Sequence, residues 1–216
     1  MTNDLTLWGI GTSRTMRVHW MLIELGLEYE FHPIQSRSGE TRTDGFKLLN
    51  PRHKIPVLRH RSLVLTESAA IINYLSDTVA NPKSFYVPSE PNTRAKLSEW
   101  CYFIVSELDA SSLYVVRRHD SLRQIYGHAP VAVESAKDYF LHNIESMAAP
   151  IGDREPYLFG ELLSVADILL TTCLDWAATC GIHLPEIPAR YRKRVALRPG
   201  YQAALKRNFV DYQDRS

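Results

Sequence analysis

The first eighty residues change their hydrophobic period several times. The apolar run LTLWGI at residues 5–10 is typical of a buried strand, and the polar turn GTSR follows it. Residues 18–25 then repeat apolar side chains at helical spacing up to Gly26, and LEYEFHPI alternates as a half-buried strand does. FKLLNP predicts a short helix, IPVLRH and SLVLT predict two brief strands, and residues 70–75 return to helical spacing. The expected order is therefore βαβαββα.

Beyond residue 80 the pattern shows no strand alternation. NPKSFYVPSEPN contains three prolines and predicts a linker over residues 81–91. Apolar stripes at helical spacing follow in residues 97–114, in residues 133–147 and in SVADILLTTCLDWAATC. We expect an α/β domain over residues 1–80 and an all-helical domain over residues 92–216.

Charge and cysteine content exclude several classes of function. The chain has 25 lysines and arginines against 24 aspartates and glutamates. This near balance supplies no large positive electrostatic field to hold a nucleic acid or an anionic membrane. No apolar run approaches the roughly 20 residues of a membrane span, and the first residues lack a signal-peptide pattern. We expect a cytoplasmic protein that binds neither nucleic acid nor membrane. Cys101, Cys173 and Cys180 lack CxxC spacing, which favours buried reduced thiols over disulfides or metal ligands.

Several motifs together resemble one known family. The βαβαββα order, NPRHKIPVL, ESAAIINYL, the proline-rich linker and SVADILL are similar to the cytosolic glutathione transferases over nearly the whole chain. The resemblance implies a thioredoxin-like domain joined to a helical domain, and a homodimer that serves detoxification. It also implies reduced glutathione as co-substrate, an electrophilic small molecule as second substrate, and no metal. Apolar residues on neighbouring elements, Tyr74, Leu97 and Trp100, are candidates for the dimer interface.

The resemblance assigns the glutathione peptide backbone to the segment before the third strand. It implies that Pro56 is cis and that the backbone of Ile55 pairs with the cysteinyl unit of glutathione. The residues alone also fit a proline that merely begins a strand. In NPRHKIP, the family pattern places His53 at the glycyl carboxylate, and Lys54 could share that contact. The alternative is an exposed basic turn.

A carboxylate and a hydroxyl, Glu67 and Ser68, stand where the next helix begins. Ser68 can act as N-cap, and the positive end of the helix suits an anion. Together the pair matches the carboxylate and ammonium of the γ-glutamyl end of glutathione. The alternative is a solvent-facing cap that binds nothing.

The reacting thiol needs a group that favours its ionised form. Lowering a thiol pKa from near 8.5 by about two units requires roughly 2.7 kcal/mol. Counting back from Arg17-Val18 places the hydroxyl of the serine-type enzymes at Thr12, whereas Ser13 is better placed to cap the helix or to offer its N–H. LTLWGI contains no tyrosine and no cysteine precedes Cys101. The chain therefore resembles a serine-type-like bacterial member, although either hydroxyl fits and both could be simple caps.

The helical part contributes fewer candidates. Ser164 and Asp167 form a capping-box pattern, which we interpret as structural. Tyr114, Arg117 and Arg118 fall late in the first long helix, where the family has its second-substrate pocket, although the arginines also fit a solvated helix end. A glutathione-dependent isomerase or dehalogenase would share the thiol site, and a non-catalytic binding or regulatory protein would share the fold.

Overall fold

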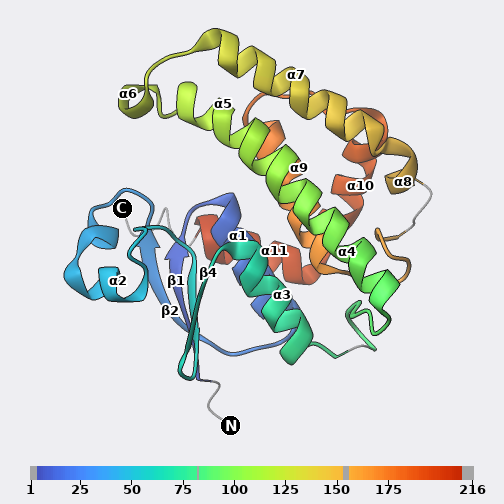
Figure 1. The fold of residues 1–216 in the computed structure, drawn as a ribbon. Helices are drawn as coiled ribbons and strands as arrows, with labels where there is room; N and C mark the ends of the chain where they lie inside the picture. The colour runs from blue at the N-terminus through green and yellow to red at the C-terminus, as the bar shows by residue number, and fades with distance from the viewer. Residues whose placement is uncertain (1–3, 82, 153–155, 211–216) are drawn as a thin grey trace. The chain divides into compact units, whose positions relative to one another are not determined.

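The computed structural model describes residues 4–81, 83–152 and 156–210. Its contacts divide the chain into two compact units, Met1–Lys83 together with Leu197–Ser216, and Ser84–Ala196 (Figure 1). The first unit contains a four-stranded sheet and the second is helical. The predicted fold class, a thioredoxin-like domain followed by an all-helical part, is confirmed.

The sheet of the first unit has the strand order β2-β1-β3-β4. Strand β1 is parallel to β2 and antiparallel to β3, and β4 is antiparallel to β3. The predicted βαβαββα order is confirmed, with one additional 3-10 helix in the polar segment before α2. The elements of this unit are β1 (Leu5–Ile10), α1 (Ser13–Glu24), β2 (Glu30–Gln35), η1 (Glu40–Arg42), α2 (Asp44–Leu49), β3 (Val57–His60), β4 (Leu63–Thr66), α3 (Ser68–Thr78), α11 (Pro199–Leu205) and the π-helix η3 (Lys206–Val210).

Strand β1 is covered on both faces, which explains why its sequence is a continuous apolar run. All six of its residues are buried. Trp8, Phe46 and Val57 form a buried cluster between the sheet and α2. Helices α1 and α3 pack against each other on the opposite side of the sheet (Figure 1).

The last helices return to the first unit. Tyr201 of α11 packs its ring edge-on against buried Trp20 of α1, with the centroids 5.1 Å apart, and Arg198 forms an ion pair with Glu24 at the end of α1. We predicted helix here from the lack of strand alternation, but a helical pattern does not say which unit a helix packs against. The boundaries predicted at residues 80 and 91 stay predictions. Pro82 of the predicted linker, and residues 153–155 and 211–216 of the predicted helical domain, lie outside the described residues.

In the second unit, a long helical run contains a π-helical segment, η2. The apolar stripe predicted over residues 97–114 changes register in η2. Leu108 and Leu113 are fully buried five residues apart, while Tyr114 is only half-buried. A spacing of five matches the i→i+5 bonding of a π-helix. None of the helices in the described ranges is long and apolar enough to cross a membrane. The elements are α4 (Pro91–Phe103), η2 (Ile104–Leu113), α5 (Tyr114–His119), α6 (Arg123–Tyr126), α7 (Pro130–Ser146), α8 (Ala148–Gly152), α9 (Val165–Thr179) and α10 (Glu186–Ala196).

The capping box predicted at the start of α9 is confirmed. Ser164 is the N-cap, and its hydroxyl lies 2.6 Å from a carboxylate oxygen of Asp167. Asp167 is fully buried and also accepts hydrogen bonds from the N–H groups of Leu158 and Ser164, both at 2.8 Å, and from the Tyr191 hydroxyl. Burial raises the pKa of the Asp167 carboxyl, and these hydrogen bonds oppose the rise. The carboxylate thus joins a loop and two helices of the second unit.

The three cysteines carry free thiols, as predicted. Cys101 and Cys173 are buried, whereas Cys180 is half-buried. Burial raises the pKa of the Cys180 thiol, which keeps it protonated at neutral pH.

Candidate functional site

Thr12 is the N-cap of α1. Its Oγ1 accepts the N–H of Thr15 at 3.0 Å, and its own N–H donates to Thr15 Oγ1 at 3.0 Å, which makes a reciprocal capping box. The hydroxyl proton of Thr12 can therefore be given to Thr15 Oγ1, 3.0 Å away, or to a ligand. The expectation that Ser13 is better placed to cap is wrong, because Ser13 is the first helical residue. Both hydroxyls are half-buried at the positive end of α1.

The end of β1, just before the turn to Thr12, depends on Gly9. Its φ is +127°, and a Cβ atom there would lie 2.8 Å from Ile55 Cβ and 2.9 Å from Thr15 Cγ2. Only glycine combines this backbone conformation with so close an approach. Gly9 therefore lets β1 run directly against two residues of the candidate site.

The segment before β3 is held by the side chain of Asn50. This buried amide donates to the carbonyl of Lys54 at 2.8 Å and accepts the N–H of Arg52 at 3.1 Å. The Ile55–Pro56 peptide bond is cis, as the resemblance implies. Ile55 is half-buried and Lys54 is exposed.

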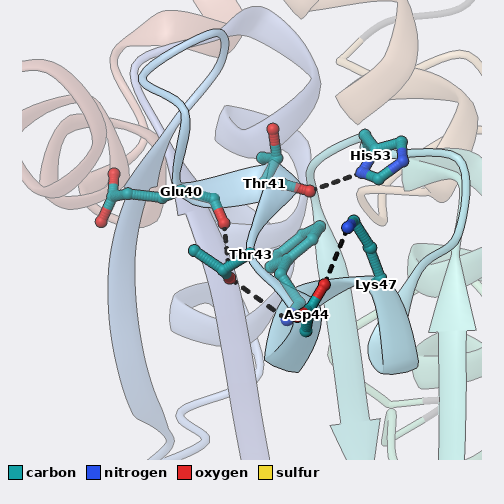
Figure 2. Close-up of polar contacts among 7 residues, drawn as sticks. Glu40, Thr41, Thr43, Asp44, Lys47 and His53 are labelled. Atoms are coloured by element: carbon teal, nitrogen blue, oxygen red, sulfur yellow. Dashed lines mark hydrogen bonds and ion pairs between the residues drawn. The ribbon is translucent and has the colours of Figure 1, made fainter.

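His53 is exposed and points at η1 (Figure 2). Its Nδ1 lies 2.6 Å from the carbonyl of Thr41, and because a carbonyl only accepts, Nδ1 carries the proton. The nearby Thr43 caps α2, and Lys47 pairs with Asp44 at 2.8 Å. With Nδ1 already used, His53 can donate to a carboxylate through Nε2 only when its ring is doubly protonated.

The start of α3 differs in one respect from the expectation. Glu67, not Ser68, is the N-cap, with a φ of 68° and an exposed carboxylate 3.5 Å from Arg52 Nη1. Ser68 is the first helical residue and is buried, and its Oγ accepts a hydrogen bond from Arg17 Nη1 at 3.2 Å. Because a guanidinium only donates, the Ser68 hydroxyl keeps its own proton for another acceptor. The pair therefore offers a carboxylate, a hydroxyl donor and a helix N-terminus.

Arg17 of α1 is 1% exposed, and its guanidinium connects α1 to Ser68, the first residue of α3. From the sequence alone, Arg17 is only the position from which Thr12 is counted. A charged residue inside the apolar stretch of α1 was the available signal, because a buried guanidinium requires partners. Asn50 and Thr15 were also missed, since single polar residues of these types usually occur in turns and caps.

Tyr114, Arg117 and Arg118 lie together on α5 of the second unit. The Arg118 guanidinium stacks on the ring of Tyr126, 4.5 Å from its centroid. Their assignment to a second-substrate pocket stays a prediction. Across residues 4–81, 83–152 and 156–210, no group of three or more His, Cys, Asp or Glu side chains could hold a metal ion.

Comparison with known proteins shows which proteins the chain is similar to. Residues 3–77 match the family model "Glutathione S-transferase, N-terminal domain". The chain is 27% identical to glutathione S-transferase U28 of Arabidopsis thaliana, over 92% of this chain and 86% of the relative. The structure of glutathione transferase URE2P6 from Phanerochaete chrysosporium, in complex with oxidized glutathione, matches with a TM-score of 0.84 at 22% identity. That match covers 95% of this chain and 96% of the other.

A second solved structure is similar at a higher identity. It is the theta class glutathione S-transferase from Xanthomonas axonopodis pv. citri with glutathione bound, with a TM-score of 0.78 at 25% identity. The match covers 94% of this chain and 97% of the other. The first unit therefore matches the N-terminal domain of glutathione S-transferases, and the chain as a whole is similar to proteins of that family.

Proposed function

We propose that the protein is a glutathione transferase that conjugates reduced glutathione to an electrophilic small molecule. The observation that carries the proposal is the Thr12 hydroxyl at the N-terminus of α1, whose oxygen accepts from Thr15 and whose proton can be donated. A hydroxyl donor and a helix dipole both favour a thiolate over a thiol. The serine-type-like subtype is part of this proposal, with threonine in place of serine.

Binding of glutathione is assigned to the first unit. The γ-glutamyl end would contact Glu67 and Ser68, the cysteinyl backbone would pair with Ile55, and the glycyl carboxylate would meet His53 and Lys54. The Ser68 hydroxyl supports this assignment, because Arg17 occupies its oxygen as a donor and leaves its proton for the γ-glutamyl carboxylate. The two solved relatives that hold glutathione or its oxidized form support it at the level of the family.

The chemistry would be a direct attack by the thiolate sulfur on an electrophilic carbon. A carbon–sulfur bond forms, and the electron pair of the broken bond leaves with the departing group or enters the acceptor. The site contributes proximity and stabilisation of the anion, and no covalent protein intermediate is needed. Tyr114, Arg117 and Arg118 of α5 are proposed to contact the second substrate. The free thiols suit a reducing compartment such as the cytoplasm, where glutathione is kept reduced.

Conjugation of reduced glutathione to a panel of electrophiles tests this proposal. Turnover of aryl halides or enones would support the transferase. Turnover restricted to isomerisation or to halide release would assign the same thiol site to an isomerase or dehalogenase. Glutathione binding without turnover of any of them would assign the fold to a binding or regulatory role.

Thr12→Val should raise the apparent pKa of the bound glutathione thiol by about one to two units, because a hydrogen bond to a charged group is worth about 1.5–3 kcal/mol. The same change should lower the stability of the fold by about 1 kcal/mol, because it removes the N-cap. Thr12→Ser is the matched control, since it keeps both the donor and the cap. Ultraviolet titration of the bound thiolate measures the pKa.

Ser13→Ala separates the two hydroxyls. If Thr12 is the donor, this change leaves the thiol pKa as in the wild type. A raised pKa in Ser13→Ala with an unchanged pKa in Thr12→Val would transfer the role to Ser13. An unchanged pKa in both variants would mean that neither hydroxyl holds the anion.

We also propose that the protein is a homodimer, with interface residues other than those expected from the sequence. Leu97 and Trp100 are 6% and 7% exposed in the chain, and the Tyr74 hydroxyl hydrogen-bonds with His60 at 2.9 Å, so none of these three supports an interface. Tyr102 of α4 is 71% exposed and is the better candidate. Sedimentation should give the mass of a dimer at micromolar concentration, and Tyr102→Glu should give a monomer. A wild-type monomer would contradict the dimer.

A further inference from the structure

Asn208 of η3 contacts the candidate thiol site although 196 residues separate it from Thr12. Its side chain is fully buried. The Oδ1 atom accepts from Thr15 Oγ1 at 2.7 Å and from the Gly11 N–H at 3.2 Å, and Nδ2 donates to the Thr12 carbonyl at 3.1 Å. The Asn208 carbonyl also accepts the Gly11 N–H at 3.1 Å. One amide thus holds three of the residues around the N-terminus of α1.

The orientation of this amide is fixed by the types of its partners. Oδ1 faces a hydroxyl and an N–H, whereas Nδ2 faces a carbonyl, so the reverse orientation would place like groups together. Thr15 Oγ1 can give its single proton to Asn208 and still accept the Thr12 N–H. Asn208 therefore sets the geometry of the capping box from which the Thr12 hydroxyl projects.

The neighbouring Arg207 makes a second connection to the same turn. Its guanidinium hydrogen-bonds with the Tyr29 hydroxyl, which lies 2.8 Å from His19 Nδ1. His19 Nε2 in turn lies 3.1 Å from the Gly9 carbonyl. Burial lowers the pKa of His19 to about 4, with the hydrogen bond to the Gly9 carbonyl opposing it and the charge of Arg207 adding to it. The neutral ring must donate through Nε2 and accept through Nδ1.

We infer that Asn208 is a positioning residue of the thiol site, which holds Gly11, Thr12 and Thr15 in the arrangement that directs the Thr12 hydroxyl to the glutathione sulfur. Arg207 and Asn208, consecutive in η3, then hold the chain on both sides of Ile10. Arg207 acts on Gly9 through Tyr29 and His19, and Asn208 acts on Gly11 directly. This inference rests on the proposed function, because it deepens the assignment of the same site.

The Asn208→Ala variant tests the inference through the thiol of bound glutathione. The apparent thiol pKa should rise by about one unit, a tenfold fall in the ratio of thiolate to thiol. Affinity for glutathione should change by less than about threefold, because Asn208 hydrogen-bonds to Gly11, Thr12 and Thr15, at the site proposed for the sulfur, whereas the γ-glutamyl end is assigned to Glu67 and Ser68. The rate of conjugation below the thiol pKa should fall about tenfold, and should recover as the pH is raised.

Arg198→Ala is the matched control. It removes the ion pair between α11 and Glu24, at the opposite end of α1 from Thr12. This variant should lower the melting temperature and leave the thiol pKa unchanged. An equal pKa shift in Arg198→Ala and Asn208→Ala would overturn the inference, because general loosening of the segment would then explain both.

A second variant keeps the test independent of the folding of Asn208→Ala. Thr15→Val removes the hydroxyl that joins Asn208 to the capping box, and should also raise the thiol pKa, whereas Thr15→Ser should not. If the wild-type protein forms a thiolate and the thiol pKa is unchanged in both Asn208→Ala and Thr15→Val, the inference is overturned. The proposed function would still stand. A wild-type protein that forms no thiolate would overturn both.

Discussion

Gly9→Ala is expected to lower the free energy of unfolding by about 2–6 kcal/mol, the sum of about 1–3 for a strained backbone and 1–3 for overpacking. The strain arises because the φ of Gly9 is +127°. The overpacking arises because the new Cβ would stand 2.8 Å from Ile55 Cβ and 2.9 Å from Thr15 Cγ2. Neither neighbour can withdraw easily, since one side chain branches at the contacting carbon and the other belongs to the capping box of α1. Urea unfolding measures the loss.

Gly11→Ala is the matched control for this change. Gly11 also has a positive φ, of +78°, but within the described part of the chain a Cβ added there would meet no atom within 4 Å beyond its two chain neighbours. It should lose only the strain, about 1–2 kcal/mol. Equal losses in the two variants would contradict the close packing of β1 against Ile55 and Thr15.

Asp167→Ala is expected to lower the free energy of unfolding by about 3–5 kcal/mol, because it leaves buried donors without an acceptor. The N–H groups of Leu158 and Ser164 and the hydroxyls of Ser164 and Tyr191 all point at this carboxylate. Burial raises the pKa of this carboxyl, so the buried charge is itself destabilising. Removing the acceptor nevertheless destabilises the fold more than losing that buried charge stabilises it. Urea unfolding with a signal from the helical unit measures the loss.

Asp175→Ala provides the comparison on the same helix. Asp175 accepts from Arg192 Nε at 2.6 Å, but the two side chains are 20% and 35% exposed. A partly exposed ion pair is worth about 1 kcal/mol or less. Similar losses at residues 167 and 175 would mean that the capping network of α9 adds little beyond an ordinary ion pair.

The fold was predictable because its signals are local. The six-residue β1 is apolar throughout since both its faces are covered, and α9 begins at a serine and aspartate three residues apart. The register change at η2 was not predictable, because a helical stripe is read with one fixed period. The return of α11 to the first unit was also missed, since Trp20 and Tyr201 meet only in space.

The sequence indicated which residues to consider for the candidate site more readily than the role of each one there. Thr12 and Ser13 both fit a helix start, and only the backbone conformation distinguishes the N-cap from the residue after it. The same one-residue ambiguity explains why Ser68 was expected to be the N-cap of α3, whereas Glu67 is the N-cap. Arg17 contributes through a hydrogen bond to another helix, and such long-range pairs leave no periodic pattern in the sequence.

We propose above all that the first unit binds reduced glutathione through the start of α3. Calorimetric titration of glutathione into the wild type, Glu67→Ala and Ser68→Ala tests this binding most directly. We predict binding by the wild type and an affinity reduced about tenfold to a hundredfold in each variant, because each loses a charge-assisted hydrogen bond worth about 1.5–3 kcal/mol. No binding by the wild type, or the same affinity in all three proteins, would contradict the account.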